Sequence, residues 1–370
     1  MPSNTASSPR GWLPDLPLWT ILTPLSAGIV MAAAAFDLSI GGVFVAVIAV
    51  SLAASVFAAV HHAEVVAHRI GEPYGTLVLA LAVTLIEVAL IVSLMIAGGT
   101  EAAALARDTV FAAVMIILNG IIGLCLVVGG LKHSQQTFNL DAVSAALVAL
   151  AAIVILTLVF PNYTVTTPGP YYSPSQLMLI AVVSLAIYGA FVFAQTIGHR
   201  RIFVHDLAEE QQQHASQPSN AVTAASAILL LACLAAVVLL AKKLAPSLET
   251  AVSRVGAPNA VVGVIIAAIV LLPEGLAALR AARANRLQTS LNLALGSALA
   301  SIGLTIPAVG VLSLYMHTRL VLGIDTKATV LLILSLFITA IALRTGRTIV
   351  LHGIVLLVIF VVYLFTTVIP

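Results

Sequence analysis

Long apolar runs dominate this sequence and constrain its fold more than any other feature. Each run is roughly 20 residues long, enough for an α-helix to cross a hydrocarbon core about 30 Å thick. Eleven such segments are predicted, near residues 18–36, 41–60, 75–98, 109–130, 141–160, 175–197, 221–241, 257–279, 290–315, 328–343 and 348–368. Because lipid offers no water to satisfy the backbone, these segments should be helices, and they lack the alternating pattern of an outer-membrane barrel.

The low charge content also indicates a membrane protein. Only 8% of the 370 residues are charged and 61% are hydrophobic, whereas a soluble domain carries about 25% charged residues. The net charge of +2 gives no reason to expect a nucleic-acid partner. Cys125 and Cys233 lie inside apolar runs, so no disulfide framework is expected. We therefore expect an all-α, polytopic protein of an inner membrane, surrounded by lipid.

The distribution of Lys and Arg among the connections predicts the orientation. If the N-terminus is cytoplasmic, the connections on that side carry ten basic residues: Arg10, Arg69, Lys132, Arg200, Arg201, Arg280, Arg283, Arg286, Arg344 and Arg347. The other side then carries six: Arg107, Lys242, Lys243, Arg254, Arg319 and Lys327. Cytoplasmic loops are enriched in Lys and Arg, so a cytoplasmic N-terminus is favoured.

The longest polar connection, residues 198–220, divides the chain into two parts. One helix and then five more precede it, and five follow it. An odd number of helices per part inverts the second relative to the first, as in inverted-repeat transporters. The predicted organisation is a tail and first helix at 1–40, a five-helix repeat at 41–197, an acidic cytoplasmic loop at 198–220 and a second five-helix repeat at 221–370.

One acidic residue lies deep in a helix of each repeat. Glu87 is the only charged residue of segment 75–98, and Glu274 is the only acid of segment 257–279. Glu87 lies about 18 Å along its helix, close to the bilayer midplane. A charge at that depth costs at least about 2.5–3.5 kcal/mol, so it needs a partner, a cavity or an ion. The alternative is a pair of buried glutamates that only help the helices to pack.

A helix with small and polar residues follows each glutamate helix. The first carries Asn119, Gly120 and Gly123, and the second carries Gly296, Ser297, Ser301, Gly303 and Thr305. Small residues let helices approach closely, and Ser, Thr and Asn supply neutral oxygens for a cation. Thr84, one turn before Glu87, could add a hydroxyl. Pro273 should free the carbonyl of Ile269 for the same purpose, or simply kink its helix.

Three other polar groups have a functional and a simpler interpretation. Asp206, Glu209 and Glu210 would share one face of a helical loop, as a cation sensor or only as a solvated surface. Glu72 is a candidate vestibule residue at the cytoplasmic mouth, or only a first-turn acid. A further set has loose metal-ligand spacing but lies at a membrane surface without cysteines: His61, His62, Glu64 and His68.

Two stretches of the sequence resemble the paired repeats of one transporter superfamily. HAEVVAHRIGEPYGTLVLALAVTLIEVALIVSLM runs from His62 to Met95, and LLPEGLAALRAARANRLQTSLNLALGSALASIGLTIP runs from Leu271 to Pro307. With the G-S-x-x-x-S element at Gly296–Ser301, the eleven-helix layout and the acidic central loop, they are similar to the Ca²⁺/cation antiporter superfamily. The resemblance is to bacterial ChaA-type Ca²⁺(Na⁺)/H⁺ antiporters of the calcium/proton exchanger branch, and it covers nearly the whole chain.

This resemblance implies one extra N-terminal helix, two inverted five-helix repeats and an exchange of cytoplasmic cations for protons. Carried over by position, Glu87 and Glu274 are the carboxylates that bind the cation, with Asn119, Ser297 and Ser301 as their neighbours.

One departure from the pattern of the wider exchanger branch concerns the cation. Relatives usually have Gly-Asn four and three residues before each glutamate, where this chain has Val83-Thr84 and Val270-Leu271. Two amide oxygens are therefore missing, which leaves Na⁺ or K⁺ open beside Ca²⁺.

A pair of deep carboxylates predicts a mechanism. Two carboxylates close together in a poorly hydrated cavity resist ionising together and titrate as a coupled unit. A cation that neutralises both competes with protons for one site, and this competition couples the two fluxes.

We therefore expect a secondary active antiporter that exports Ca²⁺ in exchange for H⁺, with a Na⁺/H⁺ or K⁺/H⁺ antiporter of the same fold as the alternative. A passive channel would not need a titratable pair. An intramembrane protease would need an Asp pair or an HExxH motif, which the sequence lacks. Neither an enzymatic activity nor a resident cofactor is expected.

Overall fold

The computed structural model describes residues 16–35, 41–71, 74–98, 104–198, 218–254 and 256–369, and almost all of them are helical. In these residues nine helices are long and apolar enough to cross a membrane. Two shorter apolar helices, at Leu18–Ala34 and Val78–Ser93, complete the eleven that the sequence predicts. The predicted class, an all-α polytopic membrane protein, is confirmed.

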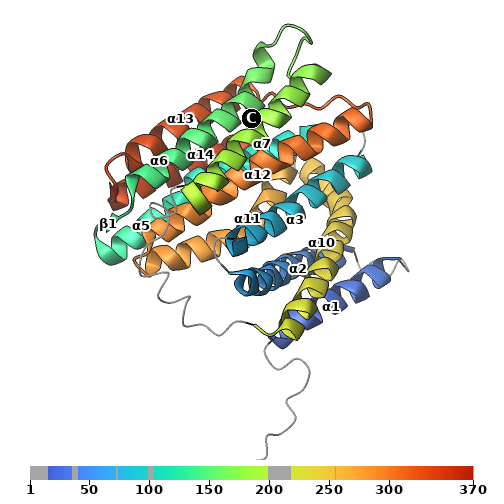
Figure 1. Ribbon diagram of the computed structural model, residues 1–370. Coiled ribbons are helices and arrows are strands. Elements are labelled where there is room, and N and C mark those ends of the chain that lie inside the picture. Colours follow the sequence, from blue (N-terminus) through green and yellow to red (C-terminus); the bar gives the residue numbers. More distant parts are fainter. Residues whose placement is uncertain are drawn as a thin grey trace, which may run out of the picture. The chain divides into compact units, whose positions relative to one another are not determined.

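Figure 1 labels most of these elements along the chain. Their bounds are α1 Leu18–Ala35, α2 Gly41–Ile70, α3 Tyr74–Gly98, α4 Leu105–Met115, η2 Ile116–Ile121, α5 Ile122–His133, β1 Gln136–Thr137, α6 Leu140–Val154, η3 Ile155–Val159, η4 Phe160–Tyr163, α7 Pro174–Phe193, η5 Ala194–Gly198, α10 Asn220–Arg254, α11 Ala260–Arg283, α12 Leu287–Tyr315, α13 Thr326–Leu343, β2 Arg347–Thr348 and α14 Val350–Val368. Within the described residues, three of the spans contain a π-helical turn: η2, η3 and η5.

Two helices run well beyond the apolar segments that predicted them. The segment predicted at 41–60 continues as helix to Ile70, and the one predicted at 221–241 continues to Arg254. A helix satisfies its own backbone in water as well as in lipid, so it need not end where hydrophobicity ends. The chain leaves α2 at Gly71, whose φ of +76° is a left-handed conformation that glycine adopts without strain.

The chain forms two compact units. The first comprises Met1–Leu79 and Ser216–Leu240, and in it α1 packs against α2. The ring of His61 lies 5.9 Å from that of Trp19, and Nε2 of His62 lies 3.3 Å from the carbonyl oxygen of Thr20. Arg69, near the end of α2, donates a hydrogen bond to Asn220 at the start of α10.

The second unit comprises Ala80–Ala215 and Ala241–Pro370 and holds most of the described helices. In it α6, α7, α12, α13 and α14 lie side by side (Figure 1). The continuous span from α4 to α5 and the span of α12 are the most enclosed of the described spans. Their apolar stretches are 78% and 67% buried, whereas that of α14 is 22% buried. These two enclosed spans are also the ones predicted to carry the polar neighbours of the glutamates.

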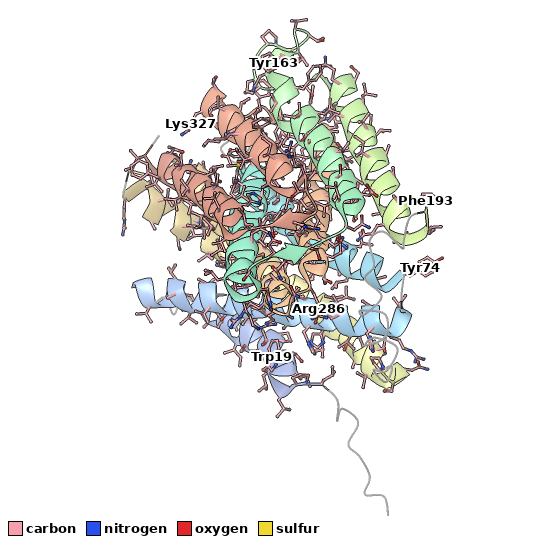
Figure 2. All side chains as sticks on the ribbon, turned by 90° about the vertical axis from the view of Figure 1, so that its left-hand side faces the viewer. Trp19, Tyr74, Tyr163, Phe193, Arg286 and Lys327 are labelled. Carbon is pink, nitrogen blue, oxygen red and sulfur yellow. The ribbon has the colours of Figure 1, made fainter. Side chains whose placement is uncertain are left out.

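The described connections of the second unit lie at two opposite ends. At one end the short strands β1 and β2 pair antiparallel, and Gln136 donates a hydrogen bond to the carbonyl oxygen of Ala282 at the end of α11. Figure 2 shows Arg286 toward this end and Tyr163 and Lys327 at the other. The two ends therefore separate the connections in the way that alternate membrane crossings predict.

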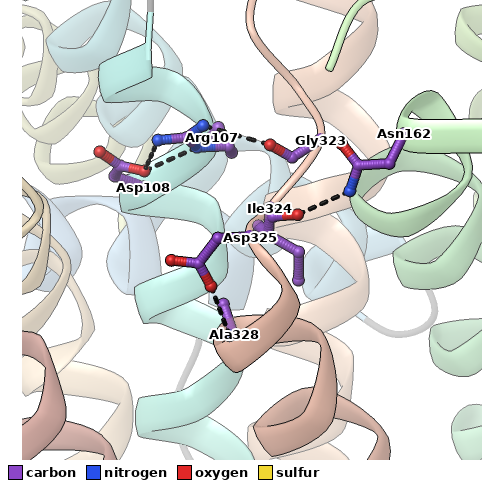
Figure 3. A network of polar contacts seen from close by, with 7 residues as sticks. All are labelled: Arg107, Asp108, Asn162, Gly323, Ile324, Asp325 and Ala328. Atoms are coloured by element: carbon purple, nitrogen blue, oxygen red, sulfur yellow. Dashed lines mark hydrogen bonds and ion pairs between the residues drawn. The ribbon is translucent and has the colours of Figure 1, made fainter. Parts of the chain in front are cut away.

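At the end near Tyr163, polar side chains join three connections (Figure 3). Arg107 forms an ion pair with Asp108 at 2.7 Å and donates to the carbonyl oxygen of Gly323 at 3.1 Å. The amide of Asn162 donates to the carbonyl oxygen of Ile324 at 2.6 Å. Asp325 accepts from the backbone N–H of Ala328 and caps α13. The loop before α13 is thereby tied to the start of α4 and to the 160–163 turn.

Candidate functional site

Glu87 lies on α3 and is buried, with 3% of its surface exposed. Its neighbours along the helix, Ile86, Leu90 and Ile91, are buried and apolar. The carboxylate nevertheless has a polar partner, because the hydroxyl of Ser301 on α12 donates to Oε2 at 2.5 Å. Two of the predicted site residues, far apart in the sequence, are therefore in direct contact.

Glu274 lies on α11, and both of its carboxylate oxygens are buried. Its position along the helix axis, relative to α4, η2 and α5, follows from two glycines of α11 that lie close to that span. A Cβ atom on Gly263 would lie 3.0 Å from the backbone of Thr109, and one on Gly275 would lie 3.2 Å from the side chain of Ile121. The two spans therefore run parallel in a constant register, which places Glu274 at the level of Gly120 and next to that of Asn119.

The C-terminal end of α11 also contacts the end of α5. At the end of α5, Nζ of Lys132 and Nε2 of His133 each lie 3.0 Å from the carbonyl oxygen of Arg283. A cation near the C-terminus of a helix interacts favourably with the helix dipole, so Lys132 also suits this position electrostatically. α11 therefore contacts the α4–α5 span both before and after Glu274. Together these contacts fix the position of Glu274 along the helix axis relative to η2.

Asn119 lies in the π-helical turn η2 and is completely buried. Its amide nitrogen donates to Oγ of Ser335 on α13 at 2.9 Å and to the carbonyl oxygen of Met115 at 3.3 Å. Its amide oxygen, Oδ1, is buried and has no hydrogen-bond partner among the described residues. A π-helical turn is rare and is often found at functional sites.

Thr305 supplies a second buried oxygen of this kind. It lies one turn after Ser301 on the same face of α12, and its Oγ1 has no hydrogen-bond partner in the described part of the chain. A buried polar atom without a partner costs about 1–3 kcal/mol, and native structures usually satisfy such atoms with protein, water or an ion. Asn119 and Thr305 therefore offer oxygens that an ion or water can use.

The other predicted neighbours are placed less specifically. Thr84 is buried, but its hydroxyl donates to the carbonyl oxygen of Ala80 in its own helix at 2.9 Å. Ser297 is half-buried on α12, one turn before Ser301. The helix α11 continues through Pro273 from Ala260 to Arg283. The release of the Ile269 carbonyl therefore stays a prediction.

The remaining candidates are the predicted vestibule and sensor acids, which lie outside the described residues, and the predicted metal ligands, which do not come together as a metal site. Glu72, Asp206, Glu209 and Glu210 belong to stretches that the structure does not describe. Within the described ranges, no group of three or more His, Cys, Asp or Glu side chains could hold a metal ion. The spacing of His61, His62, Glu64 and His68 thus does not form a metal centre there.

The sequence predicts that each half supplies a glutamate helix and a polar helix, but it does not show which of these helices contact each other. In the structure, Glu87 contacts Ser301 of the later half. Glu274 lies at the level of Gly120, next to Asn119 of the earlier half. Ser335 was missed altogether, because a single serine in an apolar helix gives no distinguishing signal.

Comparison with protein families gives one match that spans both halves of the chain. The model of the sodium/calcium exchanger protein family matches residues 38–197 and 225–369. The stretches that carry Glu87, Asn119, Glu274 and Ser301 all fall inside these two ranges.

Curated proteins with similar sequences are transporters. The protein y4hA of Sinorhizobium fredii, described as an ionic transporter, is 48% identical over 358 residues, which cover 96% of this chain and 97% of that protein. The sodium-potassium/proton antiporter ChaA of Escherichia coli K12 is 39% identical over 320 residues, 86% of each chain. A vacuolar calcium ion transporter of Schizosaccharomyces pombe is 23% identical over 65% of this chain and 59% of its own length.

Solved structures share the fold at low sequence identity. The structure of native YfkE superposes with a TM-score of 0.71 and 18% identity, covering 95% of this chain and all of the other. The crystal structure of the H⁺/Ca²⁺ exchanger CAX gives a TM-score of 0.70 and 14% identity, covering 94% of this chain and 88% of the other.

Proposed function

Because this chain belongs to the sodium/calcium exchanger family, we propose that it is a secondary active cation/proton antiporter in which Glu87 and Glu274 bind cation and protons alternately. The observation that carries the proposal is the buried contact between Glu87 and Ser301. An ionisable side chain this deep in an apolar helix is costly unless it has a function or a partner. The proposed site adds Glu274 and Asn119, which lie at one level on packed helices.

The proposed mechanism is competition. With both carboxylates deprotonated, a cation is held by their negative charge and by neutral oxygens from Ser301, Asn119 and Thr305. Protonation of the carboxylates removes the charge that holds the cation and gives a neutral site. If the site opens alternately to the two sides of the membrane, a proton gradient drives cation export without another energy source.

For the cation, we propose Na⁺ or K⁺ as the first candidate. The relative with 39% identity is named a sodium-potassium/proton antiporter. Val83-Thr84 and Val270-Leu271 also stand where relatives in the wider exchanger branch usually have Gly-Asn, so two amide oxygens are missing.

Ca²⁺ is the second candidate. Two carboxylates match a divalent charge, and Ca²⁺ takes six to eight oxygen ligands in typical protein sites. Transport with each cation tested alone separates the two candidates.

The proposed location is the inner membrane of a bacterium, with a cytoplasmic N-terminus. The lysine and arginine distribution supports this orientation, because ten of the sixteen basic residues would face the cytoplasm. The proton gradient would then drive protons inward and cations outward.

Everted vesicles carrying Glu87→Gln or Glu274→Gln test the two carboxylates. Glutamine keeps the size of the side chain but cannot release a proton, so each variant should lose cation-dependent proton release almost entirely. Ser55→Ala, which changes a buried serine on α2, serves as a control for expression and insertion. Substantial cation-dependent proton release in both glutamine variants would refute the proposed site.

A further inference from the structure

We infer that Ser335 on α13 is a positioning residue, whose hydroxyl sets the orientation of the Asn119 amide so that Oδ1 faces away from α13 and is available to the cation. This inference rests on the proposed function, and it assigns a role to a helix that contains neither glutamate. Ser335 is completely buried, and it acts through Asn119 instead of touching the cation itself.

The hydrogen-bond directions follow from the single proton of the Ser335 hydroxyl. Oγ of Ser335 donates to the carbonyl oxygen of Leu331, one turn earlier, at 2.7 Å. The thioether sulfur of Met115 lies 3.6 Å away and is a weaker acceptor. Since its proton is engaged by Leu331, Ser335 can only accept from Asn119. The amide of Asn119 must therefore present its nitrogen to α13.

Both protons of the Asn119 amide then have acceptors. One is directed to Oγ of Ser335 at 2.9 Å and the other to the carbonyl oxygen of Met115 at 3.3 Å. The amide group is planar, so its oxygen lies on the side opposite the nitrogen. Oδ1 is thus turned away from Ser335, in the turn that lies level with Glu274, where it is buried without a hydrogen-bond partner among the described residues.

An amide turned by half a rotation would have the opposite effect. Its NH₂ group would then take the place of Oδ1 and repel a cation, while Oδ1 would face the hydroxyl oxygen of Ser335. Because that hydroxyl already donates to Leu331, two oxygens would meet without a proton between them. Ser335 therefore disfavours the turned amide. With alanine at position 335, the two orientations of the Asn119 amide would no longer be distinguished in this way.

The first test compares variants of Ser335 in liposomes by cation-dependent proton flux. Ser335→Ala should raise the KM for the cation about fivefold to tenfold with a small change in kcat, because loss of one oriented ligand weakens binding by the equivalent of about one hydrogen bond. Ser335→Thr keeps an acceptor oxygen and should retain the wild-type KM. Ser55→Ala is the matched control, because Ser55 is equally buried and makes the same bond to the carbonyl four residues earlier, at 2.8 Å.

A double-mutant comparison separates positioning from packing. In an Asn119→Ala background no amide remains to be oriented, so Ser335→Ala should cause no further rise in KM. The cation-induced rise in melting temperature of the purified protein gives the same comparison without transport. If Ser335→Ala does not fold, Ser335→Cys, whose sulfur is a weak acceptor, should show the raised KM in its place.

The outcomes distinguish this inference from the proposed function. If wild-type protein exchanges cations for protons, Asn119→Ala raises the KM and Ser335→Ala does not, the inference is overturned and the antiporter stands. An equal rise for Ser335→Ala with and without Asn119 would also overturn it. If wild-type protein shows no cation-dependent proton flux, the proposed function itself fails.

Discussion

At the scale of the residue, the Ser301–Glu87 hydrogen bond gives the most direct prediction. The donated bond stabilises the deprotonated carboxylate, so its removal in Ser301→Ala favours the protonated form and strengthens protons as competitors. We expect the KM for the cation to rise about tenfold at neutral pH, as loss of a bond to a charged group predicts. Ser301→Thr should keep most of the affinity. Proton flux measured over a range of cation concentrations gives the KM of each variant. An unchanged KM in Ser301→Ala would contradict the assigned contact.

Tyr172, between η4 and α7, gives a pH-dependent prediction about stability. Its hydroxyl donates to the carbonyl oxygen of Leu156 at 2.5 Å, and burial raises the pKa of Tyr172 above its ordinary value. An unfolded tyrosine ionises near pH 10. The stabilisation is therefore fully present below about pH 10 and is lost progressively above it.

Tyr172→Phe should accordingly lower the free energy of unfolding by about 1 kcal/mol at pH 8. Above about pH 10 the wild type should lose stability faster than the variant, so that the difference shrinks. Thermal unfolding in detergent at a series of pH values measures this. A difference that grows with pH would show that the neutral hydroxyl is not the stabilising form.

The residues of the site were predictable only as far as charge and depth reveal them. Glu87 and Glu274 stand out because an acid inside an apolar helix is costly. Asn119 and Ser301 were candidates because their helices follow those of the glutamates. Their partners depend on which helices pack together, and Ser335 looks in sequence like any serine that bonds to its own helix.

At the scale of the element, glycine contacts fix how closely α14 approaches α5. A Cβ atom on Gly353 would lie 2.6 Å from the carbonyl oxygen of Gly123 and 2.7 Å from the backbone nitrogen of Val127. These neighbours are backbone atoms, which cannot move aside as a flexible side chain would. The two helices must therefore separate if Gly353 gains a side chain.

Gly353→Ala should destabilise the protein by about 1–3 kcal/mol, the usual cost of overpacking. Gly189→Ala on α7 is the matched control, because a Cβ atom there would meet nothing within 4 Å. Melting temperatures of the two purified variants make the comparison. Equal melting temperatures would mean that α14 does not approach α5 this closely.

Secondary structure was largely predictable at this scale, whereas the local departures were not. Apolar runs locate the spans because lipid requires a satisfied backbone. They do not show the extension of α2 to Ile70, which depends on the helical preference of polar residues in water. The π-helical turn at Asn119 was also unforeseen, because its sequence, IILNGI, carries no signal for a wider turn.

At the scale of the whole molecule, the predicted orientation can be checked at two labelled positions. Tyr163 and Arg286 lie toward opposite ends of the second unit (Figure 2). Tyr163→Cys should react with a membrane-impermeant thiol reagent from the periplasm, and Arg286→Cys only from the cytoplasm. The native Cys125 and Cys233 are buried and should stay unlabelled. The reverse pattern would place the N-terminus outside.

The central claim is that cation and proton movements are coupled, and reconstituted liposomes test it most directly. Purified protein is given a pH step with Na⁺, K⁺ or Ca²⁺ at equal concentration on both sides, and cation content is followed over time. We predict that at least one cation moves against its developing gradient, driven by the proton gradient, and that Glu87→Gln abolishes this movement. Cation movement that only equalises concentrations, whatever the pH step, would contradict antiport and indicate a passive channel.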